Sequence, residues 1–445
     1  MALRAHADVQ ALTDESVRYL QDLLRIDTTN PPGNEIHAVS YLAEVLRRAG
    51  YQPLILESLP GRGNLIVRYQ GTGELKPLLL YGHVDVVMAE SQHWTHAPFS
   101  GQLADGCVWG RGAIDMKGMV VQELMVMLLL QRSGVRLKRD VIFAATADEE
   151  VGGRAGMGYL VEHHPDLIRA EYGLSEGGGT TMYIAGKPFY DIRTAEKGIC
   201  RFKLRAYGEP GHGSVPRPET SISKLAQAVL KLSTTPLPFR STATVAALFE
   251  LLGASLGVPR DRRQFTEQNF QRFLQVLPAD FGQYLHAITH DTAVPTSLRA
   301  GHKINVIPGQ AEAMVDGRYL PGQTPEGFLA EVRRVVGEDY EIEPTDHLSS
   351  PLEDMSGGPL YDTIVSVVGR YAPKATVLPI MLAGATDAER VSRLGTRCLG
   401  FSPLRVSEGF PIEQLVHGHD ERIPIEGYVW GIQVLHDIVT EFCAG

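Results

Sequence analysis

The stretch that decides the fold is residues 78–85, Leu-Leu-Leu-Tyr-Gly-His-Val-Asp. Its four leading apolar residues predict a strand that is covered on both faces, and Val141–Ala145 has the same character. Polar residues follow each run at once. At the carboxyl end of a strand, residues two apart point to the same side, so His83 and Asp85 are expected to share a side there. The run Asp148-Glu149-Glu150 likewise places acids at the mouth of a buried sheet.

Around these two strands the chain alternates helical and strand patterns. Helices are expected near 13–25 and 35–49, and strands near 53–57 and 63–69. This alternation, which lasts to about residue 190, predicts a layered α/β sheet. At Arg201–Tyr207 polar and apolar residues alternate, which is typical of a half-exposed antiparallel strand. A second domain is therefore expected to begin just before it.

The second domain is expected to be an α+β sandwich inserted into the first. Its expected elements, in chain order, are a helix near 219–232, strands near 303–307 and 311–319, a helix near 325–336 and a strand near 340–344. Residues 240–300 are interpreted as a further insertion within it. The α/β pattern returns with the apolar run Val377–Leu382 and a closing helix from about 425 to 442. The first domain thus comprises 1–194 and 346–445, and the inserted domain comprises 195–345.

Composition agrees with two soluble domains. A chain of 445 residues with 44% hydrophobic content is too long for one ordinary core. The net charge of −10 is spread without long runs of one sign, so no nucleic-acid partner is expected. The apolar segment Met119–Leu130 is interrupted by Gln122 and Glu123 and is too short to cross a bilayer, so no membrane partner is expected.

Cysteine usage and the beginning of the chain suggest a reducing compartment. The first twenty residues are too charged for a secretory leader. No C-x-x-C pair occurs, so neither a disulfide framework nor a thiolate zinc site is expected. The four cysteines are far apart in the sequence, at Cys107, Cys200, Cys398 and Cys443. A cytoplasmic location fits best.

His83 and Asp115 are the first candidates for metal ligation. An imidazole that binds zinc usually donates its other N–H to a carboxylate, and Asp85 is close enough in sequence to orient His83 in this way. Asp115 lies within the glycine-rich turn Gly110–Gly118, which leads into an apolar helix. Such a turn can present Asp115 between two cations.

Further acids and imidazoles complete the candidate set. Glu149 and Glu150 are adjacent and must point in different directions, which suits one carboxylate that ligates metal and one that accepts a proton from water. Glu176 precedes three glycines. The segment 417–421, His-Gly-His-Asp-Glu, supplies imidazole from the far end of the chain.

In this order, the motifs resemble the zinc aminoacylase, acetylornithine deacetylase, succinyl-diaminopimelate desuccinylase and glutamate carboxypeptidase family over essentially the whole chain. The resemblance implies an α/β, zinc-peptidase-like catalytic domain whose central mixed sheet is flanked by helices. It also implies that the inserted α+β domain is a ferredoxin-like lid and dimerisation domain. The activity implied is hydrolysis of an amide bond.

The resemblance also implies the role of each residue. Two Zn²⁺ ions are expected, with Co²⁺ or Mn²⁺ as substitutes, because a set of histidine and carboxylate ligands tolerates all three. The implied assignments are His83 and Glu176 on one ion, Glu150 and His417 on the other, Asp115 bridging both, and Glu149 as general base. The family pattern H-x-x-[N/D]-E favours His417 as the ligand, with His419 as the alternative. The peptide bond between Asp115 and Met116 is expected to be cis.

Substrate contacts are implied in the same way. In Gly211-His212-Gly213-Ser214 the imidazole of His212 is expected to stabilise the oxyanion. Asn305 and Arg318 match residues that contact substrate, with the arginine clamping a free carboxylate. Gly384 and Thr386 match a glycine-rich loop that lines the pocket.

A homodimer that pairs through the lid domain is expected, because in the family the lid histidine reaches the neighbouring subunit's site. The alternating strand Arg201–Tyr207 is interpreted as a strand able to form the edge of the sheet, and pairing with a second copy would cover it.

Other functions fit the sequence less well. A dinucleotide site is disfavoured because Asp115 replaces the third glycine of G-x-G-x-x-G, and a serine hydrolase because His212 stands two residues before Ser214. A catalytically silent peptide-binding protein would be expected to lack the base or some ligands. Among hydrolases, an N-acyl-amino-acid deacylase is the first choice and a carboxypeptidase or dipeptidase for short peptides the alternative.

Overall fold

The computed structural model describes residues 6–275, 277–354 and 357–445, and the chain forms two compact units. Unit 1 comprises Met1–Thr194, Asp354–Pro379 and Thr386–Gly445, and unit 2 comprises Ala195–Glu353 and Ile380–Ala385. The end of the inserted domain, expected at 345, is corrected by strand β15 (Glu341–Ser349). This strand continues past residue 345 and stays paired with the sheet of unit 2, since Ser349 lies opposite Ile199.

Unit 1 is an α/β domain. Its helices are α1 (His6–Leu24), α2 (Glu35–Arg48), α3 (Lys117–Ser133), α4 (Met157–His163), α5 (Pro165–Ile168), α11 (Pro359–Tyr371), α12 (Ala388–Ser392), α13 (Ile412–Leu415) and α14 (Ile425–Ala444). Its strands are β1 (Leu54–Leu59), β2 (Arg62–Tyr69), β3 (Leu78–His83), β4 (Gln102–Ala104), β5 (Cys107–Trp109), β6 (Val141–Thr146), β7 (Tyr172–Ser175), β8 (Met182–Ile184), β9 (Lys187–Glu196), β17 (Thr376–Leu382), β18 (Arg397–Gly400) and β19 (Arg422–Pro424), with the last residues of β9 and β17 in unit 2.

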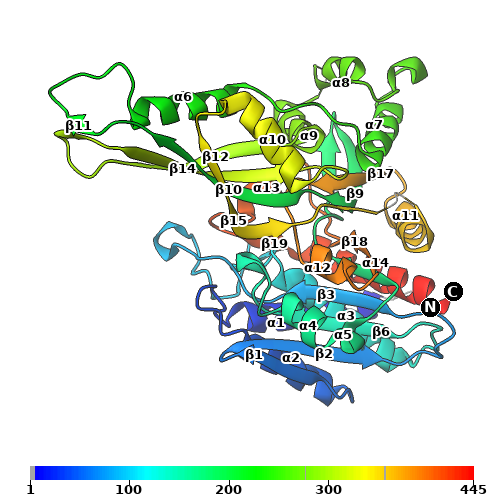
Figure 1. Ribbon diagram of the computed structural model, residues 1–445. Helices are drawn as coiled ribbons and strands as arrows, with labels where there is room; N and C mark the ends of the chain where they lie inside the picture. The colour runs from blue at the N-terminus through cyan, green and yellow to red at the C-terminus, as the bar shows by residue number, and fades with distance from the viewer. Residues whose placement is uncertain (1–5, 276, 355–356) are drawn as a thin grey trace. The chain divides into compact units, whose positions relative to one another are not determined.

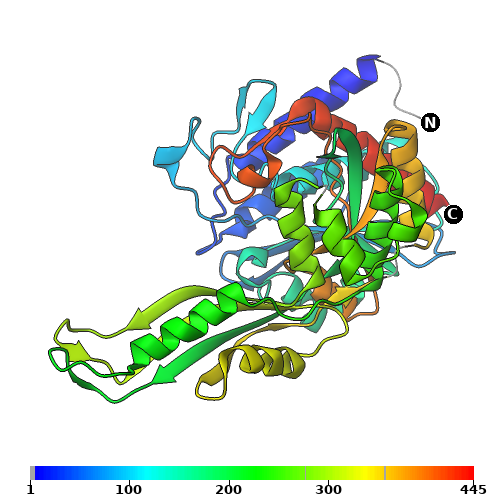
Figure 2. The same cartoon turned by 90° about the horizontal axis from the view of Figure 1, so that it is seen from above.

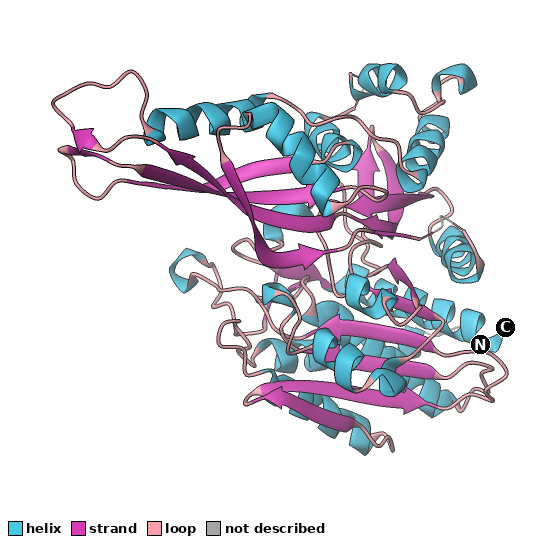
Figure 3. Ribbon diagram, viewed as in Figure 1, coloured by secondary structure: helices cyan, strands magenta, loops and turns pink. Residues whose placement is uncertain are grey.

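The central sheet of unit 1 is mixed. Its strands follow the order β1-β2-β6-β3-β7-β18-β9, and β6, β3, β7 and β18 run parallel to one another while the flanking pairs are antiparallel (Figures 1 and 3). Every residue of β3 and of β6 is buried, as their continuous apolar runs predict. Because β3, β6 and β7 are adjacent and parallel, their carboxyl ends meet at one edge of the sheet.

Helices cover the sheet of unit 1. Alternate strand residues such as Leu78, Leu80 and Phe143 share one hydrophobic core with α1, α2, α3, α11 and α14. Helix α12 packs against β7, β18 and α4. The apolar segment Met119–Leu130 lies within α3 and is almost entirely buried, so it is a core helix. No helix in the described part of the chain combines the length and apolar character needed to cross a membrane.

Unit 2 contains a four-stranded antiparallel sheet of order β12-β14-β10-β15. Its strands are β10 (Gly198–Tyr207), β11 (Gly211–His212), β12 (Thr292–Ala300), β13 (Val306–Ile307), β14 (Gln310–Tyr319), β15 and β16 (Leu352–Glu353). Its helices are α6 (Ser221–Thr234), α7 (Ala243–Ser255), α8 (Glu267–Leu274), α9 (Ala279–Thr289) and α10 (Pro325–Val336). Helices α6 and α10 share a core with the inward side chains of β10 and β14, and Figure 2 shows α6 alongside these strands.

Three expectations for unit 2 were wrong in detail. The segment 240–300 is not wholly an insertion, because 292–300 forms β12 of the main sheet and only the part before it contributes the additional helices α7 to α9. The strand expected at 303–307 is confined to β13. Strand β10 is not an edge strand, since it pairs with both β14 and β15; the edges are β12 and β15.

Candidate metal centre

Three neighbouring parallel strands deliver the first candidate ligands. His83 is the last residue of β3, Glu149 and Glu150 lie in the short 3-10 helix that follows β6, and Glu176 directly follows β7. The strand register places His83 opposite Thr146, the last residue of β6. Side chains that are distant in sequence are therefore gathered at the edge where these strands end.

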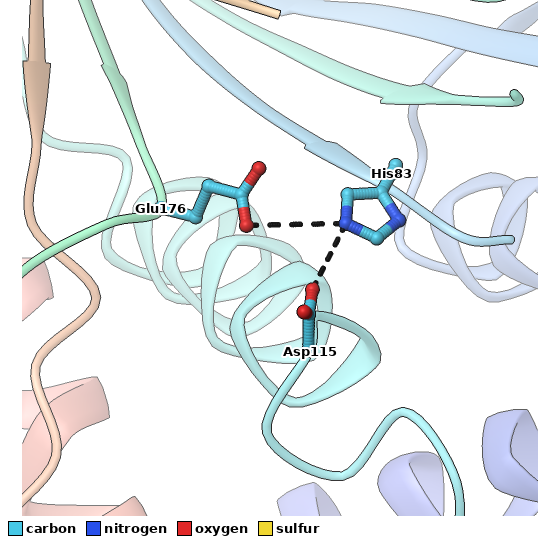
Figure 4. Close-up of side chains that lie close together, drawn as sticks. All are labelled: His83, Asp115 and Glu176. Atoms are coloured by element: carbon cyan, nitrogen blue, oxygen red, sulfur yellow. Dashed lines mark hydrogen bonds and ion pairs between the residues drawn. The ribbon is translucent and has the colours of Figure 1, made fainter. Parts of the chain in front are cut away.

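Asp115 reaches the same place from a turn between β5 and α3. Its Oδ1 lies 3.1 Å from His83 Nε2, and Glu176 Oε2 lies 3.9 Å from the same nitrogen. Figure 4 shows these three side chains pointing toward one another. One ligand atom from each of the three residues lies within 4.8 Å of the others. The peptide bond between Asp115 and Met116 is cis, so that expectation is confirmed.

A second group shares Asp115. His417 Nε2 lies 3.2 Å from Asp115 Oδ2 and 3.2 Å from Glu150 Oε2. The ligand atoms of Asp115, Glu150 and His417 again lie within 4.8 Å of one another. His419 belongs to neither group among the described residues, and its ring lies 5.1 Å from that of His93. The two oxygens of Asp115 thus face two different histidines.

The chemistry of these groups suits divalent cations. Each offers one imidazole nitrogen and two carboxylate oxygens, a set that Zn²⁺, Co²⁺ and Mn²⁺ accept. Glu150 Oε1 is buried without a hydrogen-bond partner in the described part of the chain. A buried carboxylate oxygen without a partner is costly, and a cation beside it would remove that cost. The residues present therefore fit a pair of metal ions.

The electrostatics of the histidines show how strongly this cluster favours positive charge. Burial opposes protonation of His83, but its hydrogen bonds with Asp115 and Asp85 outweigh burial and raise the pKa of the imidazole well above its usual value. Hydrogen bonds with Asp115 and Glu150 raise the pKa of His417 to about 10. Burial opposes ionisation of Asp115, but its hydrogen bonds to His417 and His83 hold its pKa below the usual range.

Two glutamates in the cluster have raised pKa values. Burial, followed by the charge of Glu176, raises the pKa of Glu149 well above its usual value. Burial also raises the pKa of Glu176 to about 7. Glu149 Oε2 lies 4.0 Å from His83 Nε2, yet Glu149 is in neither candidate ligand group. Its carboxylate thus lies beside the first group without belonging to it, and it is available to exchange a proton.

Asp85 does more than orient His83. The Nδ1 atom of His83 lies 3.0 Å from the backbone oxygen of Asp85 and 3.4 Å from its carboxylate, so the backbone contact is the shorter one. The carboxylate of Asp85 accepts the backbone N–H groups of Glu149 and Glu150, at 3.2 Å each. Asp85 therefore holds the turn that carries the two glutamates.

Behind Asp85 lies a polar network that the sequence did not reveal. Asn30 donates to the Asp85 carboxylate at 2.8 Å, and Arg62 donates to Asn30 Oδ1 at 3.2 Å and to Asp148 Oδ1 at 2.6 Å. Asp148 in turn accepts the backbone N–H of Ala155. Asn30 and Arg62 belong to no motif, and their relevance arises only from contacts made in the folded chain.

The residues expected to contact substrate divide into separate places in unit 2. His212 and Asn305 lie together, because β11 pairs with β13 and the N–H of Gly213 donates to the Asn305 carbonyl at 2.9 Å. Arg318 is near the opposite end of β14, facing Ile199. Its guanidinium donates twice to the Asp316 carboxylate, at 2.6 and 3.2 Å. The structure does not bring Arg318 together with His212.

Gly384 and Thr386 fall in different units. The hydroxyl of Thr386 accepts the backbone N–H of Ala388 at 3.2 Å and a hydrogen bond from Arg193 at 3.1 Å. Arg193 is buried against Gly177, where a Cβ would lie 2.9 Å from the arginine Cδ. Arg193 therefore connects the Thr386 loop to the residue after Glu176, a link that no sequence motif indicated.

Known proteins resemble this chain over most of its length. The probable carboxypeptidase S-like 2 of Dictyostelium discoideum is 32% identical over 82% of this chain and 72% of the relative. The human N-fatty-acyl-amino acid synthase/hydrolase PM20D1 is 29% identical over 82% and 74%, and pig (Sus scrofa) aminoacylase-1 is 27% identical over 96% and 94%. The crystal structure of the M20 family metallo-carboxypeptidase Sso-CP2 from Sulfolobus solfataricus aligns with a TM-score of 0.73 at 19% identity, covering 96% of this chain and 99% of that one.

The fold and these likenesses define a metal-dependent hydrolase. Residues 79–441 match the family described as Peptidase family M20/M25/M40. The chain belongs to that family.

Proposed function

We propose that this protein hydrolyses the amide bond of N-acyl amino acids with a pair of zinc ions. The observation that carries the proposal is the position of Asp115, whose two carboxylate oxygens face His83 in one candidate ligand group and His417 in the other. A carboxylate between two such groups is suited to bridging a pair of metal ions. Glu149 beside them supplies the acid–base group that hydrolysis requires.

The metal ligands in this proposal are the members of the two groups. His83 and Glu176 would hold one ion, Glu150 and His417 would hold the other, and Asp115 would serve both. When bound, a zinc pair polarises the scissile carbonyl and lowers the pKa of water. Zinc fits because it accepts both imidazole nitrogen and carboxylate oxygen, and Co²⁺ or Mn²⁺ are expected to substitute.

Glu149 acts as the general base and then as the general acid. Its carboxylate accepts a proton from the attacking water and delivers it to the departing amine. The raised pKa of Glu149, due first to burial, supports proton retention between these two steps. Asp85 keeps the carboxylate in place by holding the backbone of Glu149 and Glu150.

The lid residues act on the substrate. His212 stabilises the oxyanion, Asn305 contacts substrate beside it, and Arg318 binds the free carboxylate of the amino acid. Arg318 donates two hydrogen bonds to the Asp316 carboxylate, and a substrate carboxylate would accept from the same kind of donors. Gly384 and Thr386 line the pocket. The names of two relatives, aminoacylase-1 and N-fatty-acyl-amino acid synthase/hydrolase, support an N-acyl amino acid as substrate.

Cleavage of short peptides by a carboxypeptidase or dipeptidase is the second candidate. The relative with the highest identity given above is named a carboxypeptidase, and a peptide bond presents the same carbonyl to the same groups. Both reactions need a free carboxylate at one end of the substrate. They differ in what lies on the acyl side, a plain acyl group or an amino acid that carries an amine.

We further propose that two copies associate through the edge strand β12. Val294 and Leu298 on this strand are 55% and 61% exposed, and the adjacent helix α6 exposes Ile222 and Leu230. The other edge, β15, presents Glu341 and Glu343, which are poor candidates for burial. A β-bulge near Pro295 interrupts the edge, so the contact relies on these apolar side chains as well as on the backbone.

Metal removal followed by a substrate panel tests the function. Chelation should abolish hydrolysis of every substrate, and added Zn²⁺ or Co²⁺ should restore it. The panel compares N-acetyl and long-chain N-acyl amino acids with dipeptides of the same carboxyl-terminal residue. Faster turnover of the N-acyl compounds supports the deacylase, and faster turnover of dipeptides selects the second candidate. Full activity in a metal-free sample would refute both.

A further inference from the structure

Glu421 is a fully buried carboxylate that is surrounded by hydrogen-bond donors. Its Oε2 accepts from Arg111 Nη1 at 2.8 Å and from the Gly112 N–H at 2.9 Å. Its Oε1 accepts from the N–H groups of Ile114 and Asp115 at 2.7 and 3.1 Å. Three of these four donors are backbone groups of the turn that carries Asp115. The Glu421 carboxylate thus binds the backbone of that turn at three positions.

Arg111 extends the same contact to the turn that carries His417. Its Nη2 donates to the carbonyl of Gly418 at 2.7 Å and to that of His417 at 3.3 Å. The Arg111 side chain is 2% exposed, and its guanidinium lies against the Trp94 ring. Arg111 therefore contacts both the Glu421 carboxylate, which holds the Asp115 turn, and the backbone of the turn that carries His417.

The pairing of two short strands brings these turns together. Strand β5, just before the Asp115 turn, pairs with β19, just after Glu421, and the N–H of Gly110 donates to the Glu421 carbonyl at 2.9 Å. His417 itself is 52% exposed and has a positive φ of 59°. The His417 side chain contacts Asp115 and Glu150, whereas Arg111 holds the backbone of the turn that carries it.

We infer that Glu421 and Arg111 are positioning residues that hold Asp115 and His417 at the separation needed to share one metal ion. The inference rests on the proposed metal pair. Neither side chain ligates metal in this account; both act through the backbone of the two turns. Replacing a residue that holds a metal ligand in place by hydrogen bonds typically weakens metal affinity by about 10- to 100-fold.

The chemistry of the site requires a carboxylate at position 421. A carboxylate has only acceptors, so both oxygens can accept from the N–H groups that face them. In Glu421→Gln, the amide NH₂ would face two N–H donors on one side or the other, and those donors would lose their acceptor. Arg111→Lys keeps the positive charge but cannot contact Glu421 and both carbonyls in the same fork geometry.

Metal binding by the metal-free protein is the test. Glu421→Gln, Arg111→Lys and the parent are stripped by chelation and titrated with Zn²⁺ against a chelating indicator, and Co²⁺ absorption spectra report ligand geometry. The matched control is Glu123→Gln, since Glu123 is also fully buried but lies on α3, and in the described part of the chain its oxygens bond to neither of the two turns. We expect the parent to bind two ions per chain. In Glu421→Gln and in Arg111→Lys, at least one ion should bind about 10- to 100-fold more weakly, and the Co²⁺ spectrum should change. Glu123→Gln should behave as the parent does.

Each outcome separates the two ideas. If the parent binds two ions and Glu421→Gln binds both with unchanged affinity and spectrum, the positioning role is wrong although the metal pair stands. If the parent binds no ion, the proposed function itself fails. If Glu421→Gln does not fold by circular dichroism, Arg111→Lys decides, because parental affinity in that folded variant would overturn the inference.

Discussion

The candidate ligands at the sheet edge of unit 1 and the candidate substrate-contacting residues of unit 2 differ in how tightly the backbone confines them. At the sheet edge, parallel strands end side by side, and these ends carry the candidate ligands His83, Glu150 and Glu176 to one place. In unit 2, His212 and Arg318 lie at different ends of long antiparallel strands. A parallel sheet concentrates residues at one edge, whereas a long antiparallel strand distributes them along its length.

This difference has a functional consequence. Groups that must stay within a few ångströms of one another, as metal ligands must, are found on the confined edge. The residues proposed to contact separate parts of a substrate are spread over unit 2, with His212 on β11 and Arg318 on β14. The following predictions test this division, beginning with the largest expected effect.

Glu149 and Glu150 are adjacent on the confined edge, yet we expect their replacement to have different effects. Glu149→Gln should lower kcat by about 10²- to 10⁴-fold with metal content unchanged, because it removes the proton carrier only. Glu150→Gln should lose one of two ions, because it removes a ligand of the second group. Metal content by atomic spectroscopy and steady-state kinetics measure both effects. Normal activity in Glu149→Gln would break the proposed division of roles.

His212 tests whether the extended lid serves a second subunit. The single variants His212→Ala and Glu149→Ala should each be inactive. After subunit exchange at equal concentrations, about a quarter of parental activity should return, since about half of the dimers are mixed and each holds one intact site. Exchange is followed by labelling one variant. Confirmed exchange without activity would show that His212 does not act in the partner's site.

His290 in unit 2 differs in its pKa from the two histidines of the candidate metal centre. His83 and His417 face carboxylates and have raised pKa values, whereas burial, together with the charges of His286 and Lys197, lowers the pKa of His290 to about 4. The unfolded chain then binds a proton between about pH 6.5 and pH 4 that folded His290 excludes. The free energy of unfolding should therefore decrease as the pH is lowered through this window. For one proton the decrease is no more than about 1.4 kcal/mol per pH unit.

Thermal unfolding of the parent and of His290→Gln measures this effect. The unfolding temperature of the parent relative to that of the variant should decrease from pH 7 to pH 4.5. Only in the parent does folding require an imidazole to stay neutral at a pH where the unfolded chain protonates it. A difference between the two proteins that does not change with pH would contradict the lowered pKa of His290.

The sequence predicted what depends on strand ends and missed what depends on contacts between distant segments. Asp115 and Glu150 could be found because each follows or precedes a recognisable element, and His417 because its segment resembles a family pattern; the structure brings the three within reach of one another. Asn30 and Arg62 could not, since their contacts to Asp85 and Asp148 join segments that no local pattern relates.

The alternation in β10 was misinterpreted for a physical reason. Its polar face is half-exposed, as the alternation predicts, but the strand does not form an edge, because its basic side chains make ion pairs with both neighbouring strands. Arg205 pairs with Glu312 of β14 at 2.7 Å and with Glu341 of β15 at 2.8 Å. A polar side chain in a strand gives the same pattern whether water or an opposite charge satisfies it. The pattern alone therefore could not distinguish an interior strand from an edge.

Anomalous diffraction from crystals grown with Zn²⁺ tests the central claim most directly. The account predicts two peaks roughly 3.5 to 4 Å apart, one on each side of the Asp115 carboxylate. One peak should be ligated by His83 and Glu176, and the other by Glu150 and His417. A single peak, or two peaks of which neither contacts Asp115, would contradict the account.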